Sequence, residues 1–311
     1  MTATDLFFVH ALSPLHVGSG SSVDIVDLPL VRERSTGYPY IPGSSVKGAL
    51  RSWVAARGST GDEDTLFGFR KRGAEEDGDR DTFAGALATS DARLLILPVR
   101  ASRAVFALTT SPIALRRLLR LAQEVGFGDE RFRGALAELV RDSAAMPDDA
   151  AARVAPGSLL FVAASPRLDL EDMETNLQVD ERLEVVGAFL ARNLLAEGED
   201  DYLTRRLCLL PDDTFRYFAE HATEVVARVR IDPGTRTVQQ GALWNEEYLP
   251  AESVLVGAIH SFGSRRPKAE ALDGQGCLDL LWRDRTHIVH SFGGKETTGH
   301  GRVRLARVRG G

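Results

Sequence analysis

Disulfide frameworks, membrane-spanning segments and a basic net charge are all absent from this chain, and each absence narrows the function. The two cysteines among 311 residues, Cys208 and Cys277, stand between apolar neighbours. They are typical of small core side chains and favour a reducing, cytoplasmic location. No apolar run approaches the length of a membrane-spanning helix, and the N-terminus lacks the pattern of a signal peptide. We therefore expect a cytoplasmic protein with no membrane partner.

The net charge of −6 argues at first against a nucleic-acid partner, but the charges are unevenly distributed. Residues 30–57 hold five basic residues against one acid, and residues 283–311 hold seven against two. Acidic residues gather instead at 61–64, 74–81, 168–174 and 197–201. Because phosphate binding depends on a local basic face, the two basic segments are candidate anion-binding surfaces. Solvated surface charge is the alternative interpretation.

The segment "GYPYIPGSSVKGALRSWVAARG" predicts a helix with an anion at its N-terminus. Its apolar residues follow one helical face: Val46, Ala49, Leu50, Trp53 and Val54. Ser44 or Ser45 would cap the helix. Lys47 and Arg51 lie together off the apolar stripe, where their charge opposes the helix dipole. A bound phosphate would explain them, and a capped amphipathic helix with nothing bound is the alternative.

Two glycine-rich loops are further candidates for contact with a ligand. "GSG" at 18–20 and "GGKETTGHGRV" at 293–303 match neither a Rossmann nor a Walker pattern, which disfavours NAD and ATP. In the second loop, glycines would let the backbone approach a ligand closely. Lys295, Thr297, Thr298 and His300 would donate to phosphate or ribose oxygens. A glycine-rich hairpin without a ligand is the alternative.

The order of extended and helical segments predicts an α+β fold in a single domain covering residues 1–311. Strand, helix and strand-pair patterns at both ends suggest two layers, with helices on one face of an antiparallel sheet. Residues 59–85 are polar, charged and rich in glycine, so they predict a surface insertion. Residues 165–186 are rich in acids without a clear period and suggest another.

Candidate acids occur in two segments. Asp27, before Leu28-Pro29, would lie at a rim near His16 and the first glycine loop, although Asp24 is equally plausible on chemistry and a turn-forming role is more common. In "WNEEYLP", strand alternation puts Glu246 and Tyr248 on one face and Glu247 on the other. The histidines fit neither H-E-x-x-H nor zinc-finger spacing.

The segments "LSPLHVGSG", "DIVDLPLVRERSTGYPYIPGSSVKGALR", "LWNEEYLP" and "GGKETTGHGRVRL" together resemble the RAMP superfamily of CRISPR proteins. The match is closest to the repeated backbone subunits of type III-B Cmr effector complexes. Type III-A backbone subunits share the Asp-x-Pro and "IPGSS-x-KG" elements, whereas "HVGSG", "LWNEEY" and "GGKETTGHG" suit the III-B version better. The similarity runs from the first strand to the last and is weakest at 59–85 and 129–200.

This resemblance implies an RRM-like (ferredoxin-like) core with inserted lobes, a palm, fingers and a protruding thumb hairpin, which we place within residues 165–200. In the family, several copies stack along a guide crRNA beside other Cmr-complex subunits. Their thumbs distort the guide–target duplex. An aspartate after the first strand then cuts the target single-stranded RNA at regular intervals with a divalent metal, Mg²⁺ here, with Mn²⁺ as the alternative.

The resemblance also assigns residues by motif. Asp27 matches the cleaving aspartate and is the predicted metal ligand, and His16 matches the loop histidine. Glu246 and Tyr248 match acidic and aromatic residues near the cleavage site, and Asp91 matches another acidic position. The predicted RNA-binding residues are Gly18, Ser19, Gly20, Ser44, Ser45, Lys47, Arg51, Gly293, Gly294, Lys295 and Thr297.

Three other functions stay open at this point. The chain would be a pure scaffold if it held guide RNA without cutting target. It would be a guide-processing RAMP endonuclease if His16 or His300 cut precursor RNA without metal. It would be an unrelated α+β protein if both basic segments were incidental.

Overall fold

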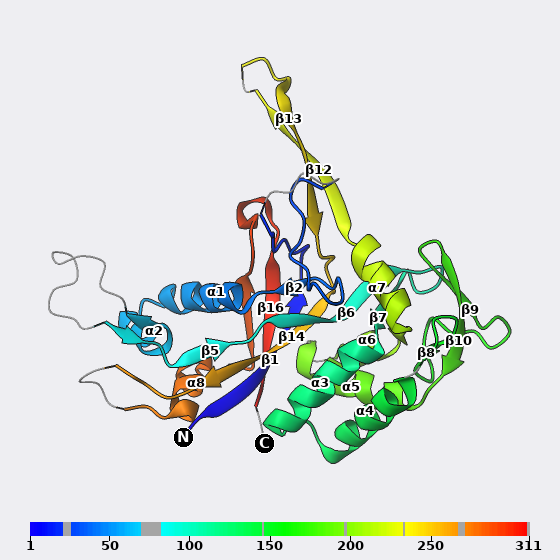
Figure 1. Ribbon diagram of the computed structural model, residues 1–311, viewed down its shortest axis with the longest axis horizontal. Coiled ribbons are helices and arrows are strands. Elements are labelled where there is room, and N and C mark those ends of the chain that lie inside the picture. The colour runs from blue at the N-terminus through cyan, green and yellow to red at the C-terminus, as the bar shows by residue number, and fades with distance from the viewer. Residues whose placement is uncertain are drawn as a thin grey trace.

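The computed structural model describes residues 1–20, 26–69, 82–144, 146–195, 198–232, 234–266 and 271–309. Its centre is a large mixed sheet in the order β15-β16-β1-β14-β6-β7-β11-β8-β10-β9 (Figure 1). These strands are β1 (Ala3–Ala11), β6 (Ala92–Arg100), β7 (Phe106–Thr110), β8 (Ala152–Val154), β9 (Arg167–Leu170), β10 (Met173–Val179), β11 (Leu207–Leu209), β14 (Val254–Ser261), β15 (His287–Ser291) and β16 (Arg302–Arg309). Short strands β2 (Tyr40–Ile41) and β5 (Leu87–Thr89) pair with β6 and β14.

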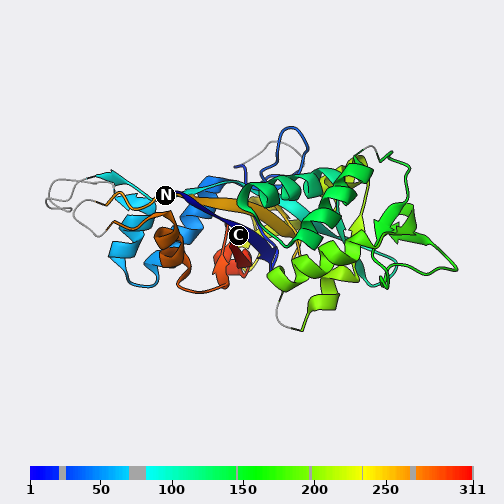
Figure 2. The ribbon, with the colours of Figure 1, turned by 90° about the horizontal axis from the view of Figure 1, so that it is seen from below.

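Most neighbours in this sheet are antiparallel, but β7 with β11 and β8 with β10 run parallel. Its helices are α1 (Gly43–Ala55), α2 (Thr60–Phe67), α3 (Pro112–Val125), α4 (Glu130–Ser143), α5 (Arg182–Leu194), α6 (Asp200–Thr204), α7 (Asp212–His221) and α8 (Gly274–Trp282). Figure 2 shows α3, α4 and α5 gathered at one end of the molecule, away from α1 and α2.

Helices cover both faces of the sheet, so the expectation of helices on one face was wrong. Phe7 and Val9 of β1 belong to a core shared with α1, α2, α7 and α8. Leu6 and Phe8 belong to a second core with α3, α4 and α5. Successive strand residues point to opposite faces, so the unbroken apolar run "LFFV" requires cover on both.

The strands at the N- and C-termini, β1 and β16, form one unit of the sheet together with β14 and β6. Helix α1 lies between β1 and β6 in sequence, and α8 lies between β14 and β16. In space the four strands are ordered β16-β1-β14-β6, and both helices pack on the same side. The loops after β1 and before β16 therefore meet near the start of α1.

Residues 59–85 are only partly the surface insertion that their polarity predicted. Residues 60–67 form α2, whose Leu66 and Phe67 are buried, and Ser59 caps it by accepting the N–H of Asp62 at 3.4 Å. Short strands β3 (Gly68–Phe69) and β4 (Phe83–Ala84) follow. Residues 70–81 lie outside the described residues, so the prediction is not tested there.

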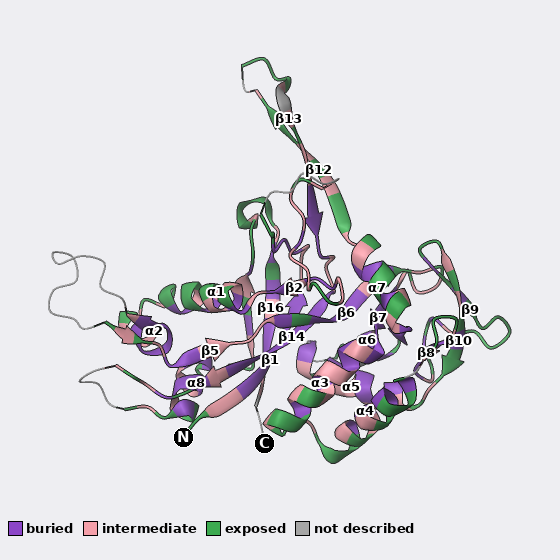
Figure 3. Cartoon of the chain, viewed as in Figure 1, coloured by how far each residue is buried: buried purple, intermediate pink, exposed green. Residues whose placement is uncertain are grey.

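The projecting hairpin lies elsewhere than residues 165–200. Strands β12 (Glu224–Ile231) and β13 (Val238–Tyr248) pair with each other in a separate two-stranded sheet and extend from the body (Figure 1). Residues 165–200 instead contribute β9, β10 and α5 to the body. The buried Leu168 and Leu170 hold β9 there, whereas β12 is exposed or half-buried throughout (Figure 3). In the part of the chain that the structure describes, no helix has the length and apolar character to cross a membrane.

Candidate nucleic-acid interface and active site

Helix α1, the loop after β1 and the loop between β15 and β16 enclose an open cleft of about 500 Å³. Four of the predicted RNA-binding residues line it together with His16: Gly18, Ser45, Gly293 and Gly294. Ser19, Gly20 and Thr297 are exposed on the same two loops but do not line the cleft. The structure therefore brings together residues from opposite ends of the sequence, as an extended RNA-binding surface requires.

The glycines of this cleft allow its two loops to touch. A Cβ on Gly293 would lie 2.2 Å from the His16 carbonyl oxygen, and the Gly293 φ is +78°. The N–H of Gly294 donates to that same oxygen at 2.9 Å. A Cβ on Gly18 would come within 2.7 Å of His16 Nε2. Close backbone approach within the protein thus explains these glycines before any ligand is considered.

Replacing Gly293 by alanine tests this packing. We expect Gly293→Ala to lower the free energy of unfolding by at least about 2 kcal/mol, because backbone strain adds to a clash with a main-chain oxygen. Gly299→Ala is the matched control, since Gly299 has a φ of +85° but no atom within 4 Å of its Cβ position. It should cost only about 1 kcal/mol. Equal losses in denaturant unfolding would contradict the close-approach interpretation.

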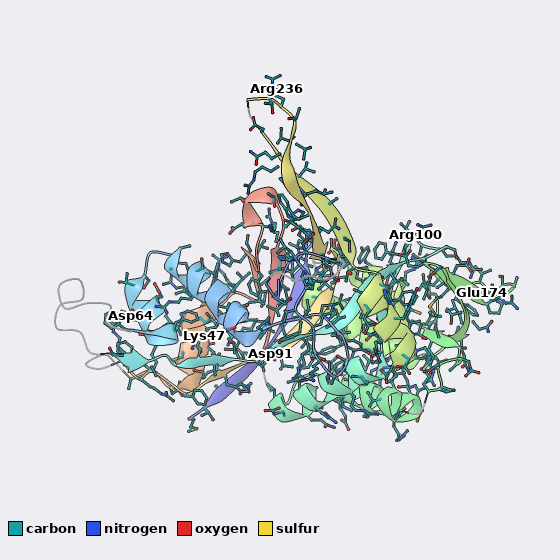
Figure 4. All side chains as sticks on the ribbon, turned by 45° about the horizontal axis from the view of Figure 1, so that its top comes forward. Lys47, Asp64, Asp91, Arg100, Glu174 and Arg236 are labelled. Carbon is teal, nitrogen blue, oxygen red and sulfur yellow. The ribbon has the colours of Figure 1, made fainter. Side chains whose placement is uncertain are left out.

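The start of α1 is held differently from the predicted serine cap. No side chain of the cap residue bonds the helix, and the N–H of Gly43 donates to Asp91 Oδ1 at 2.9 Å. Ser44 is exposed and Ser45 lies half-buried in the cleft. Asp91 is therefore a structural anchor for α1 (Figure 4).

Lys47 and Arg51 do not line the cleft. Lys47 Nζ donates to the Leu87 carbonyl at 3.0 Å, and Arg51 Nε pairs with Glu63 at 2.7 Å. Burial, followed by the charge of Arg51, lowers the pKa of Lys47. Both side chains thus lie on the side of α1 that faces β5 and α2 (Figure 4). Their contact with RNA stays a prediction.

A buried carboxylate, Glu246, organises the base of the projecting hairpin. It accepts from Trp244 Nε1 at 2.7 Å and Arg228 Nε at 3.2 Å, and also from the Tyr248 hydroxyl and Lys295 Nζ. Burial alone would raise its pKa, but the bonds from Lys295, Tyr248 and Trp244 outweigh burial and lower the pKa to about 2. Glu246 is thus a fixed anion whose partners come from β12, β13 and the glycine loop.

Tyr248 is fully buried beneath this loop, between two histidine rings. Its ring centroid lies 5.5 Å from that of His16 and 4.5 Å from that of His300. Arg228 Nη2 lies 2.7 Å from His300 Nε2. Because a guanidinium only donates, Nε2 of His300 is the acceptor in this contact. The strand alternation that put Glu246 and Tyr248 on one face is confirmed by their mutual bond.

Asp27 is exposed at the edge of β13. Its Oδ2 accepts the backbone N–H of Asn245 at 2.7 Å. The next residue, Leu28, forms a parallel bridge with Glu246, with main-chain bonds of 3.1 Å to Asn245 and 3.0 Å from Glu247. The carboxylate is therefore anchored by backbone at the base of the hairpin while facing solvent. Asp24 lies outside the described residues.

A model of the RAMP superfamily matches residues 8–304, nearly the whole chain. The chain belongs to the RAMP superfamily. In its large mixed sheet the first and last strands pair with each other, which matches the extent of this similarity.

Curated proteins and solved structures that are similar to this chain agree with its assignment to the family. It is 32% identical over 304 residues to the CRISPR system Cmr endoribonuclease Cmr4 of Pyrococcus furiosus, covering 96% of this chain and 93% of that protein. It is 27% identical over 311 residues to the CRISPR system CMR subunit Cmr4 of Saccharolobus solfataricus, covering 96% and 94%. Oligomeric Cmr4 from Pyrococcus furiosus aligns with a TM-score of 0.69 at 26% identity, over 99% and 98% of the two chains. A chain of the type III-B Cmr-beta complex bound to cognate target RNA aligns at 0.73 and 22% identity, over 98% and 96%, which supports the fold alone.

The donor set of this RAMP protein fits a loosely held divalent cation better than a closed metal site. Within the described ranges, no three His, Cys, Asp or Glu side chains gather as ligands. Glu246 is engaged by four donors, which leaves Asp27 as the exposed carboxylate on this edge. Mg²⁺ accepts such sparse ligation when water and a substrate phosphate supply the other oxygens, and Mn²⁺ accepts similar oxygen ligands.

Arg228 was not predicted from the sequence as a residue of this site, and no role was predicted for Glu247. Buried Glu247 pairs with Arg32, accepts the N–H of Leu30 at 2.8 Å and accepts Thr223 Oγ1 at 2.7 Å. It thus fastens the segment that follows Asp27 to the hairpin. The segment "EVVARVRI" holds two arginines, Arg228 and Arg230, and only the structure reveals that Arg228, opposite Trp244 on β13, pairs with Glu246.

Proposed function

We propose that this RAMP protein is a backbone subunit of a type III-B CRISPR effector complex. It would bind guide crRNA and cleave complementary target single-stranded RNA at regular intervals. The observation that carries this proposal is Asp27, an exposed carboxylate anchored on β13 at the base of the projecting hairpin. The 32% identity to a protein named a Cmr endoribonuclease supports the same activity.

The finer details of the fold belong to the same proposal. The strand order β16-β1-β14-β6, with α1 and α8 on one side, supports an RRM-like core. The β12–β13 hairpin would act as the thumb, because it projects from the body and its base carries Asp27 and Glu246. Its partners would be guide crRNA, target RNA, further copies of the chain and other Cmr-complex subunits. The oligomeric Cmr4 structure supports self-association.

Cleavage would proceed by attack of the ribose 2′-OH on the adjacent phosphate. The new 2′-O–P bond would form as the P–O5′ bond to the next nucleotide breaks, leaving a 2′,3′-cyclic phosphate on one product and a protonated 5′-hydroxyl on the other. The protein must hold the attacking 2′ oxygen in line and assist proton transfer from it. Asp27 would serve as the proton acceptor or would orient the reacting strand. When bound, a divalent cation supplies charge neutralisation at the phosphate. His16 would act from below: its Nδ1 donates to the Glu247 carbonyl at 2.7 Å and its ring supports Gly18.

The proposal is tested by target-RNA cleavage in the reconstituted complex. We expect regularly spaced cuts with Mg²⁺ or Mn²⁺ and none with a chelator, because the Asp27 carboxylate is itself an anion and charge neutralisation at the phosphate needs a cation. RNA should stay bound in both conditions, as measured by gel shift. A complex that binds target without cutting it would indicate a scaffold. Chelator-insensitive cutting of repeat RNA would indicate a guide-processing enzyme.

A further inference from the structure

The two basic segments of the sequence meet in a place that the proposed active site does not use. Arg57 follows the end of α1, and Arg283 and Arg285 follow the end of α8. Arg57 Nη1 donates to the Leu281 carbonyl at 3.1 Å, and its guanidinium lies 4.2 Å from the Trp53 ring centroid. We call Arg57, Arg283 and Arg285 the arginine cluster.

The arginine cluster carries more positive charge than its protein neighbours neutralise. Arg283 pairs with Asp62 at 2.5 Å. Arg57 Nε and Nη2 are buried and have no hydrogen-bond partner in the described part of the chain. Burial and the charges of Arg283 and Arg285 lower the pKa of Arg57, so the cluster repels itself. A bound polyanion would relieve this repulsion.

The cleft leads toward this cluster along two walls. One wall is α1, from Ser45 to Ser52, and Arg57 lies beyond its end. The other is β15, where His290 and Ser291 line the cleft and Arg285 precedes the strand. The helical rise per residue places the cluster about 18 Å from Ser45 along the axis of α1. A strand that enters at the glycine loops would reach the arginines after several nucleotides.

We propose that the arginine cluster is a phosphate-binding site for the RNA strand that lies in the α1–β15 cleft, an inference that rests on the proposed RNA-binding function. The exposed Arg283 and Arg285 contact the phosphodiester backbone, and Arg57 holds the centre of the cluster against Trp53. The site reads no base, because guanidinium–phosphate contacts carry no sequence information. RNA is favoured over an acidic protein segment because α1 and β15, which line the cleft, both lead toward the cluster.

The salt dependence of RNA binding tests this site. The probe is a fluorescent single-stranded RNA of mixed sequence. It is titrated with the full chain at salt concentrations from about 0.1 M to about 1 M, a range over which the loss of a phosphate contact changes the affinity measurably. Each lost phosphate contact should make the negative slope of log K against log salt concentration shallower by about 0.7. This change corresponds to about fivefold weaker binding at the low-salt end. Arg283→Gln and Arg285→Gln should each show this loss. The thermal stability of Arg285→Gln should be unchanged or higher, because repulsion is relieved. Arg283→Gln also loses the ion pair with Asp62, so it should be no more stable than the wild type.

Arg131→Gln is the matched control, because Arg131 is exposed on α4, which packs on the other face of the sheet. It removes the same charge and should leave the slope unchanged. Slopes of the cluster variants equal to that of Arg131→Gln would overturn the site while leaving RNA binding by the wild type intact. A change in self-association without a change in the slope would also overturn it, in favour of a protein contact. If the wild type bound no RNA, the proposed function would fail as well.

Discussion

Asp27→Asn is expected to remove target-RNA cleavage, with a rate loss of at least about 10²-fold. The asparagine keeps a side-chain oxygen that can accept the Asn245 N–H, so the loop should stay docked on β13. It cannot carry the negative charge that accepts a proton or attracts a divalent cation. The measurement is single-turnover cleavage by the reconstituted complex, with guide and target binding followed in parallel by gel shift.

The control for Asp27→Asn is Glu174→Gln, which removes an exposed carboxylate on β10 away from the cleft (Figure 4). Its cleavage rate should equal that of the wild type. Cuts that persist in Asp27→Asn would move catalysis to another residue or subunit. Loss of guide binding together with cleavage would instead make Asp27 a structural residue, because the docked loop would be needed to form the cleft.

Local signals in the sequence predicted local structure well. Ser111-Pro112 and Gly126 are such local signals at the two ends of α3: Ser111 Oγ accepts the Ala114 N–H at 3.3 Å, and Gly126 closes the helix with a φ of +71°. Such caps depend on neighbours within a few residues, so they can be found without the fold. The helix after Pro42 was found by its apolar stripe, although its anchor, Asp91, is 48 residues away from Gly43 and carried no local signal.

Features that depend on long-range pairing could not be predicted in the same way. The resemblance found Asp27 and Glu246, but not the fact that Glu246 is saturated by Arg228, Lys295, Trp244 and Tyr248. Lys295 was expected to contact RNA because a lysine among glycines is typical of a phosphate loop. In the structure its Nζ pairs with Glu246, a carboxylate 49 residues earlier, and its contact with RNA stays a prediction. The projecting hairpin was misplaced because a hairpin's exposure depends on what packs against it.

Glu246→Gln is expected to lower both stability and cleavage. The amide keeps the shape of the side chain but leaves Arg228 and Lys295 side by side without their anion. Both partners are about one-third exposed, so water relieves part of the cost, and we expect a loss of about 2 kcal/mol. Cleavage should fall as well, because Asn245, the backbone donor to Asp27, precedes Glu246 on β13. Chemical denaturation and the single-turnover assay measure the two losses.

The pH dependence of this loss separates an ionic role from simple packing. The folded pKa of Glu246, about 2, lies below its ordinary value of 4.5. Its ionic contribution is therefore fully present above pH 4.5 and is lost as the pH falls toward 2. The stability difference between wild type and Glu246→Gln should shrink over that window, whereas Glu184→Gln, exposed on α5, should match the wild type throughout. Adding Lys295→Met to Glu246→Gln should recover part of the lost stability, because the unpaired ammonium is removed. A stability difference that is constant from pH 7 to pH 2, with no recovery in the double variant, would mean that Glu246 acts by shape alone.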